Sequence, residues 1–347
     1  MAIISKKKDL FKVSVDLRQY LLKYRRSLKL PLSYDSLKRY DNSAPVYDAK
    51  GNDTLWETVF YPQGEMEEVY HSLKIIYSLT KTSGAMDVVE HLVIDRVDLC
   101  VFGNTQPFRV RVVNQINDNF DYFYIKKADA SRIYGLELEH LLSPNEINYV
   151  VDDDTLIEEH IIGVPAEQFI KKYLDDPRLN EIRLAKEFVK FNERCFVRLL
   201  GDMHSSNFVV DITPDFEEVD YRLRAIDFDQ QSYEGRRAIY LPQYFKQNNP
   251  IIQLGLRTMT PETVKQYQRE ERTLIANRVK VQGDRIRDLL AAMKTETLSR
   301  PEFVRGLRKE LSQFYEEPEF LQCKNMGAIV ELSLEMLKRK PDLYKDY

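Results

Sequence analysis

Cysteine, histidine and tryptophan are all scarce in this sequence. Its 347 residues include one tryptophan, five histidines and three cysteines, Cys100, Cys195 and Cys323. The cysteines are odd in number and far apart, so they form neither a disulfide framework nor the close spacing of a metal site. This pattern excludes a small domain held together by disulfides and suits a reducing compartment. We therefore expect a cytoplasmic protein.

A strong charge excess and long apolar runs are also missing. The formal net charge is −4, whereas contact with a nucleic-acid backbone usually needs a local basic excess. No run approaches the roughly 18 apolar residues that a membrane-spanning helix requires, and charges interrupt the first thirty residues. We expect neither nucleic acid nor membrane as a partner, and we interpret the basic start, Lys6 to Lys8, as a solvated terminus.

The residues that are present indicate a globular chain. Hydrophobic residues make up 43% of the sequence and charged residues 31%, which is enough apolar material for real cores and argues against disorder. At about 150 residues per domain, the length suggests about two domains.

The order of predicted elements divides the chain into three parts. Apolar residues at helical spacing predict helices over 9–30 and 64–81, with a loop-rich stretch between them. From residue 91 the sequence becomes rich in β-forming residues, with strands predicted at 93–102, 108–113, 122–127, 147–151 and 156–161 and a helix at 128–142. Beyond residue 163 the pattern is mostly helical, with helices at 166–173, 180–196, 262–296, 301–314 and 325–338 and short strands at 208–210 and 223–228.

These elements predict an α+β fold with two lobes. Residues 1–90 form a helical extension, residues 91–162 a lobe built on an antiparallel sheet, and residues 163–347 a mostly helical lobe.

One short stretch carries the chemistry. Asp202 is followed by Asn207 five residues later, and Asp227 stands between large apolar residues twenty residues after Asn207. One carboxylate can orient or deprotonate a hydroxyl, while the amide oxygen and the other carboxylate can hold magnesium against a triphosphate. Burial of Asp227 would be costly without a partner, which favours a metal site there.

These residues resemble a known superfamily. The run Gly201-Asp202-Met203-His204-Ser205-Ser206-Asn207 resembles the catalytic loop of aminoglycoside phosphotransferases and choline kinases. It is also similar to the loop of lipid kinases and of bacterial persistence-toxin kinases, which are atypical members of the protein-kinase-like superfamily. The run Ile226-Asp227-Phe228-Asp229 resembles their magnesium-binding turn, Tyr124-Ile125-Lys126 their third-strand lysine motif, and Ile161-Ile162-Gly163-Val164-Pro165 their hinge. The resemblance covers roughly residues 93–235.

The resemblance implies a role for each matched residue. Asp202 would be the catalytic base or the carboxylate that orients the hydroxyl, and His204 would orient the loop. Asn207 and Asp227 would bind Mg²⁺. The phosphates of ATP would be held by the strand lysine, which a carboxylate on the following helix would brace, and the adenine edge would be held by the backbone at Glu159, His160 and Ile161.

Two of these assignments stay open. Lys126 and Lys127 are adjacent, so a strand points them to opposite faces. Lys126 would share a face with Tyr124, which could stack on adenine, and the motif match favours it. Glu137 and Glu139 both lie on the next helix, about 200° apart around the axis, so only one can face the lysine; we favour Glu137.

The sequence departs from the family pattern at three points. Leu200 stands where the small-molecule kinases have histidine, and Asp229 replaces the glycine that usually ends the magnesium turn. Some atypical kinases share this aspartate, where it can add a metal contact. The first hairpin has no glycine-rich phosphate loop and offers only Gly103.

The sequence thus predicts an ATP- and Mg²⁺-dependent phosphotransferase that acts on a hydroxyl of a small molecule, or of a protein. The absence of the glycine-rich loop favours an alternative, a pseudokinase that binds nucleotide or serves as an interaction scaffold. A binuclear metallophosphatase would need several more histidine and aspartate ligands than five histidines allow.

Overall fold

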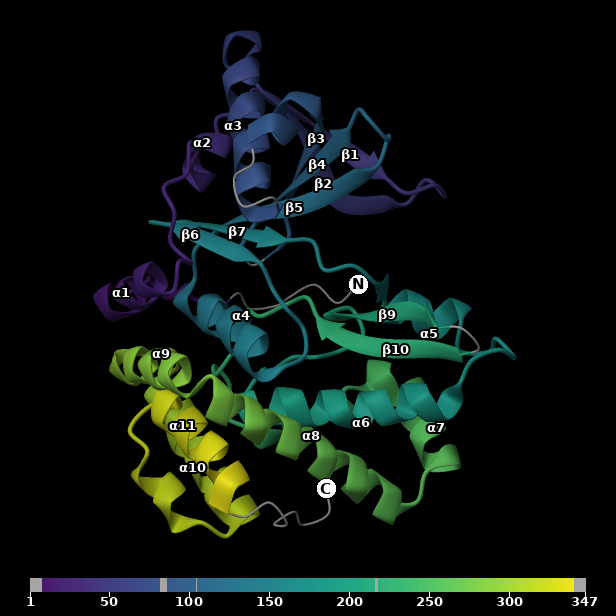
Figure 1. The fold of residues 1–347 in the computed structure, drawn as a ribbon, viewed down its shortest axis with the longest axis vertical. Helices are drawn as coiled ribbons and strands as arrows, with labels where there is room; N and C mark the ends of the chain where they lie inside the picture. Colours follow the sequence, from purple (N-terminus) through teal and green to yellow (C-terminus); the bar gives the residue numbers. More distant parts are fainter. Residues whose placement is uncertain (1–7, 82–85, 104, 216–217, 340–347) are drawn as a thin grey trace. The chain divides into compact units, whose positions relative to one another are not determined.

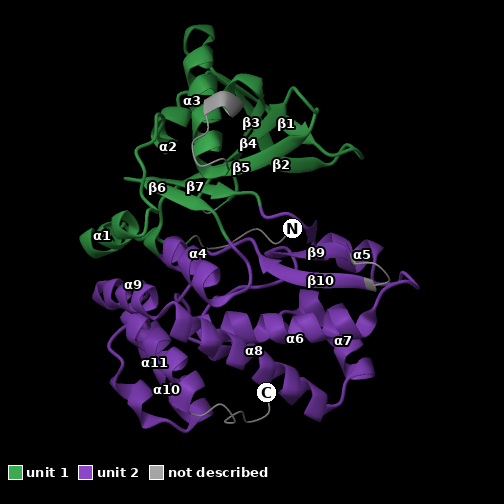
Figure 2. Cartoon of the chain, in the orientation of Figure 1, with its two compact units in different colours: residues 1–130, 147–160 green, residues 131–146, 161–347 purple. Residues whose placement is uncertain are grey.

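The computed structural model describes residues 8–81, 86–103, 105–215 and 218–339. It divides into two compact units, shown in Figure 2. Unit 1 comprises residues 1–130 and 147–160, and unit 2 comprises residues 131–146 and 161–347. The chain therefore passes between the units three times, at 130/131, 146/147 and 160/161.

Unit 1 is built on a seven-stranded sheet in which every neighbouring pair is antiparallel. The strand order is β1-β2-β3-β4-β5-β7-β6, and Figure 1 labels each of these strands. The strands are β1 (Asn42–Tyr47), β2 (Asp53–Phe60), β3 (Leu92–Cys100), β4 (Phe108–Asn114), β5 (Phe120–Lys127), β6 (Tyr149–Asp152) and β7 (Thr155–Glu159).

Helix α3 (Gln63–Lys81) supplies the apolar layer that covers this sheet. Its buried residues Val69, Leu73 and Ile76 recur at helical spacing. They pack in one hydrophobic core with Val97 of β3 and Phe123 of β5. The sheet pleat directs every second side chain to this face, which explains the alternating burial along β4.

Residues 1–90 differ from the predicted helical extension. They contain helices α1 (Val15–Lys23), α2 (Tyr34–Leu37) and α3, but also strands β1 and β2, and β2 pairs with β3. The prediction missed these strands because turn-forming residues around Gly51 interrupt the β-pattern, so that the stretch resembles a loop. Pairing with β3 supplies the backbone hydrogen bonds that local sequence could not reveal.

The expected solvated terminus is also wrong at Lys8, whereas Lys6 and Lys7 lie outside the described residues. The Lys8 Nζ donates to Asp129 Oδ2 at 3.1 Å, and both side chains are almost fully buried. The backbone N–H of Phe11 donates to Asp129 Oδ1 at 2.7 Å, and Phe11 in turn accepts from the N–H of Ala130. Residues 8–11 are therefore anchored to the turn that leads into helix α4 (Ala130–Leu142).

Removing one partner of this buried pair should be costly. We expect Lys8→Met to lower the free energy of unfolding by about 3 kcal/mol, because Asp129 would keep a buried charge without its ammonium partner. Urea denaturation followed by circular dichroism measures the change. Lys12→Met is the matched control, since Lys12 is exposed, and it should change stability by less than about 0.5 kcal/mol. Equal stability of the two variants would contradict the importance of the pair.

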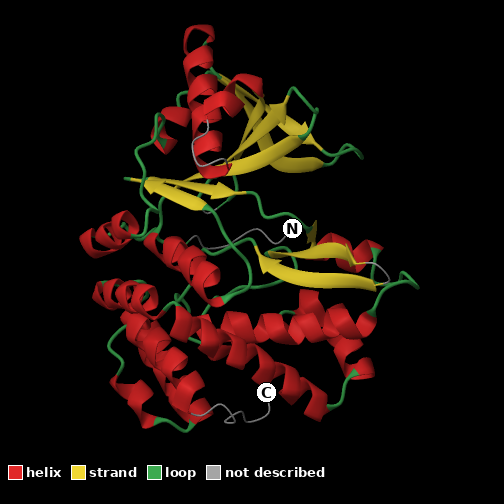
Figure 3. Cartoon of the chain, viewed as in Figure 1, coloured by secondary structure: helices red, strands yellow, loops and turns green. Residues whose placement is uncertain are grey.

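Unit 2 is mostly helical, as Figure 3 shows, and its long helix α6 (Glu181–Arg198) packs against helices that follow it in the chain. A three-stranded antiparallel sheet lies beside it, in the order β10-β9-β8. The strands are β8 (Val164–Pro165), β9 (Phe208–Asp215) and β10 (Glu218–Ala225). The α-helices that follow β8 in the described ranges, besides α6, are α5 (Ala166–Lys172), α7 (Asn249–Thr258), α8 (Pro261–Val281), α9 (Gly283–Thr295), α10 (Pro301–Tyr315) and α11 (Met326–Arg339).

The long helix predicted over 262–296 is two helices, α8 and α9. Gln282 ends the first and Gly283 begins the second, and glycine weakens a helix at the point where the chain turns. The α+β class is confirmed, with an antiparallel sheet in the N-terminal part and helices dominating the C-terminal part. None of the helices in the described ranges has the length and apolar character that crossing a membrane demands.

Candidate functional site

The β9–β10 hairpin brings two of the three motif residues together. The strands pair in antiparallel register, with Phe208 opposite Ala225. The N–H of Ile226 then donates to the carbonyl of Asn207 at 3.0 Å, which extends the pairing by one step. Asn207 stands just before β9 and Asp227 just after β10, so both lie at the same end of the hairpin.

The loop that carries Asp202 is fixed by backbone hydrogen bonds on both sides. Helix α6 ends at Leu199, whose left-handed conformation (φ 57°) reverses the chain. The N–H of Gly201 donates to the carbonyl of Gln230 at 3.2 Å, and the N–H of Asp202 donates to that of Ile239 at 3.1 Å. Asp202 itself has φ 61°, a strained conformation that persists only where the surroundings enforce it.

Asn207 closes this loop through its side chain. Its Nδ2 donates to the carbonyl oxygen of Asp202 at 2.8 Å, and its backbone N–H donates to the carbonyl of His204 at 2.8 Å. Asn207 thus joins Asp202 to the end of the hairpin where Asp227 lies.

The electrostatics of Asp202 reflect this arrangement. Burial, together with the negative charges of Asp227 and Glu234, raises the pKa of its carboxyl group from 3.8 to about 7. A carboxyl group with such a pKa can accept a proton near neutral pH, which an ordinary aspartate does poorly. The sequence did not predict a role for Glu234, because its charge affects the pKa of Asp202 without belonging to any recognisable motif.

His204 supports the loop from inside. Its ring lies edge-on to Phe245, with centroids 6.2 Å apart, and its Nδ1 accepts a hydrogen bond from the N–H of Ser206 at 3.3 Å. An accepting Nδ1 places the ring proton on Nε2 in the neutral form. Burial lowers the pKa of His204, although the charges of Asp227 and Glu167 oppose the effect. These contacts hold the ring within the loop, and the orienting role of His204 stays a prediction.

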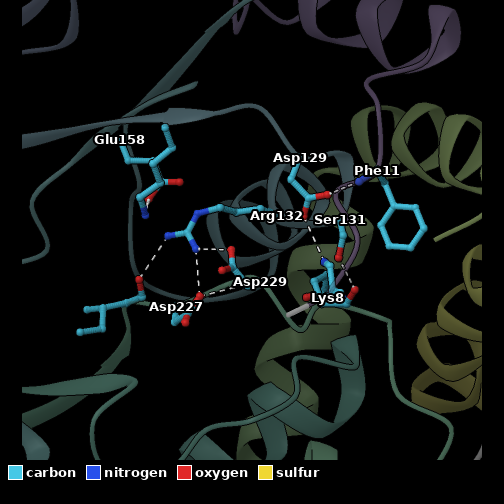
Figure 4. Close-up of polar contacts among 11 residues, drawn as sticks. Lys8, Phe11, Asp129, Ser131, Arg132, Glu158, Asp227 and Asp229 are labelled. Carbon is cyan, nitrogen blue, oxygen red and sulfur yellow. Dashed lines mark hydrogen bonds and ion pairs between the residues drawn. The ribbon is translucent and has the colours of Figure 1, made fainter. Parts of the chain in front are cut away.

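A buried arginine, missed at the level of sequence, organises the predicted magnesium turn. Arg132, near the start of α4, donates from Nη1 to Asp227 Oδ1 at 2.9 Å and to Asp229 Oδ1 at 2.7 Å, as Figure 4 shows. Its Nη2 donates to the carbonyl of Ile226 at 3.4 Å, and its guanidinium lies 5.9 Å from the centroid of the Phe228 ring. The only hint in the sequence is a charge among apolar residues on a predicted helix.

The donor set at the end of the hairpin suits a hard cation. Amide and carboxylate oxygens, as in Asn207 and Asp227, are the ligands that Mg²⁺ prefers. In the described ranges, however, no three histidine, cysteine, aspartate or glutamate side chains form a metal-binding group. A site here would therefore use few protein ligands, with the substrate phosphates supplying others, which is usual for Mg²⁺. Asp229, predicted as a third ligand, is bound to Arg132.

In unit 1, the two candidate lysines differ in burial. Lys126 is 7% exposed, donates to Glu158 Oε2 on β7 at 2.8 Å and lies 5.5 Å from the centroid of the Tyr124 ring. Lys127 is half-buried. The shared face of Lys126 and Tyr124 agrees with strand alternation. Glu158 was not predicted as a partner, because that pairing depends on the register between β5 and β7.

The helix carboxylates proposed as partners of this lysine both contact arginines of unit 2. Glu137 accepts from Arg285, with Nε at 2.8 Å. Glu139 forms an ion pair with the buried Arg198. Burial opposes ionisation of this carboxyl group, but the charge of Arg198 and hydrogen bonds from Ser143 and Asn145 hold its pKa below the usual value. The prediction that Glu137 braces the lysine stays a prediction.

The predicted hinge coincides with the passage from unit 1 to unit 2, since His160 belongs to the first and Ile161 to the second. The N–H groups of Glu159 and His160 donate to the carbonyls of Asn148 and Tyr122. The backbone groups of this segment that the prediction still assigns to the adenine edge are therefore its carbonyl oxygens and the N–H of Ile161.

The His160 ring lies against aromatic neighbours in unit 1. Its Nδ1 is 3.2 Å from the hydroxyl of Tyr124, and burial raises the pKa of that hydroxyl to about 12.

Comparisons with known proteins give little further information. No protein-family model matches the chain, and no curated protein matches it. Among solved structures, the chain is similar to one described as titin kinase and its flanking domains, with 13% sequence identity and a TM-score of 0.28. The match covers 70% of this chain and 54% of that one, so the chain spans about half the length of the structure it matches. The function proposed below therefore rests on the residues of this chain.

Proposed function

We propose that this protein is a kinase-like phosphotransferase that moves the terminal phosphoryl group of ATP to a hydroxyl, with Mg²⁺ as cofactor. The carrying observation is the register of the β9–β10 hairpin, which sets Asn207 and Asp227 at one end. Asp202 lies close enough to Asp227 for its pKa to rise. A small-molecule acceptor is favoured over a protein because Gly163-Val164-Pro165 resembles the small-molecule kinases.

Each residue of the loop has a separate task in this reaction. Asp202 accepts a hydrogen bond from the acceptor hydroxyl and takes its proton as the bond to phosphorus forms, which a pKa of about 7 allows at neutral pH. His204 and Asn207 keep Asp202 in its strained conformation. Asn207 and Asp227 would hold Mg²⁺, which, when bound, neutralises charge on the phosphate oxygens. The phosphate-binding role of Lys126, in unit 1, stays a prediction from the sequence.

A scaffold without catalysis is the second candidate, and one observation favours it. Arg132 already forms ion pairs with both carboxylates of the predicted metal turn, and a chain that needs no Mg²⁺ could keep this arrangement permanently.

Thermal denaturation with ATP and Mg²⁺ tests the proposal. A ligand at about 100 times its Kd stabilises the folded state by about 2.7 kcal/mol, so the melting temperature of the natural protein should rise. Asp227→Asn preserves the shape of the side chain and removes its charge, so it should abolish the part of the rise that depends on Mg²⁺. Asp220→Asn is the matched control, because Asp220 is exposed on β10 of the same hairpin.

Three outcomes separate the candidates. A rise that Asp227→Asn removes, together with transfer of ³²P from labelled ATP to members of a metabolite library, supports the phosphotransferase. The same rise without any transfer or ATP hydrolysis supports the scaffold. If ATP and Mg²⁺ leave the melting temperature of the natural protein unchanged, the proposed function is wrong.

A further inference from the structure

The guanidinium of Arg132 occupies the position between the two carboxylates of the 226–229 turn. One nitrogen, Nη1, lies 2.9 Å from Asp227 Oδ1 and 2.7 Å from Asp229 Oδ1. A cation that bridged these two oxygens would have to stand in the same place (Figure 4). Arginine keeps its charge at any physiological pH, and the side chain is only 2% exposed. The turn thus already contains one permanent cation.

The two carboxylates differ in what else can reach them. The side chain of Asp227 is 38% exposed, whereas that of Asp229 is 12% exposed. Asp227 Oδ1 also accepts the N–H of Asp229 at 3.0 Å, which fixes the shape of the turn. A soluble ion can therefore approach Asp227 from solvent, while Asp229 faces the arginine.

We propose that Arg132 is a positioning residue that limits the turn to one divalent ion. It takes the place that a second ion would need, and it reserves Asp229 as its own partner rather than as a metal ligand. This inference rests on the proposed function, since it concerns how Mg²⁺ is held at Asp227. Under this proposal Asp229 pairs with Arg132, in place of the direct metal contact that the sequence predicts.

Removing the arginine should change the number of ions bound. Removing Arg132 takes away the guanidinium nitrogen that contacts both carboxylates, and like charges at close range are unfavourable. A second divalent ion relieves that repulsion. Arg132→Met keeps most of the volume and removes the charge, so we expect it to bind two ions where the natural protein binds one.

Electron paramagnetic resonance counts the ions directly. Mn²⁺ is titrated into equimolar protein and a non-hydrolysable ATP analogue, and the signal of free Mn²⁺ is recorded, with the analogue alone as a blank. For the natural protein the free signal should rise after one equivalent, and for Arg132→Met after two. Arg287→Met is the matched control, because Arg287 is exposed on α9, and it should bind one.

A second variant keeps the inference testable if Arg132→Met does not fold. Asp229→Asn should still bind one ion, with an affinity within about threefold of the natural protein, because Asp229 is not a ligand. Loss of Mn²⁺ binding in Asp229→Asn, or a second equivalent in the natural protein, would overturn the inference and leave the proposed function standing. If the natural protein and the analogue together bind Mn²⁺ no more tightly than the analogue alone, both the inference and the proposed function are wrong.

Discussion

Replacing Asp202 with asparagine should reduce the rate of phosphoryl transfer by about 10²- to 10⁴-fold, the usual contribution of a positioned general base. Asparagine has the same shape, so the loop bonds made by the backbone of Asp202 should persist. It cannot accept a proton, however, and the hydroxyl of the acceptor would have to lose its proton to water. The loss should appear in kcat, with little change in the KM for ATP, because Asp202 acts on the acceptor.

The measurement is the steady-state rate of ADP release with an acceptor found in the library screen. Asp220→Asn, on the exposed face of the same hairpin, should keep the rate within about twofold. If Asp202→Asn retained more than a tenth of the natural kcat, Asp202 would not be the base that takes the proton. Catalysis would then have to be explained by the charge at Asp227.

The parts of the site that the sequence predicts are those set by short-range geometry. Asp202 and Asn207 are five residues apart, and a tight loop joins them. Asn207 and Asp227 flank two strands that neighbour each other in the chain, and an antiparallel hairpin necessarily returns its second strand beside the start of the first. Spacing alone was therefore enough to suggest that these three residues meet within unit 2.

The contacts that the sequence does not predict join distant residues. Arg132 lies 95 positions before Asp227, and its place among apolar residues of a predicted helix does not say which carboxylate it would meet. Glu158 bonds Lys126 because β7 pairs with β5. The burial of Lys8 likewise depends on Asp129, 121 residues away. Local pattern carries no information on such pairings, because many alternative partners satisfy it equally well.

The carboxyl group of Asp202 should also make the stability of the protein depend on pH. In the folded state the pKa of Asp202 is raised from 3.8 to about 7, so between these values the unfolded chain releases a proton that the folded chain retains. The unfolded state therefore binds fewer protons, and the free energy of unfolding falls as pH rises from about 4 to 7. At 1.36 kcal/mol for each pKa unit, the full loss is about 4 kcal/mol, and the partial exposure of Asp202 reduces it to about 2–4 kcal/mol.

Asp202→Asn isolates this effect, since asparagine does not titrate in that range. In EDTA, urea denaturation should show the variant to be more stable than the natural protein by about 2–4 kcal/mol at pH 8, with the difference shrinking toward zero near pH 4. A difference that is constant across this range would mean that Asp202 is ionised at low pH in the folded protein, as an exposed aspartate would be. That result would also argue against Asp202 as the base. The raised pKa that destabilises the folded protein is the same raised pKa that lets Asp202 accept a proton near pH 7.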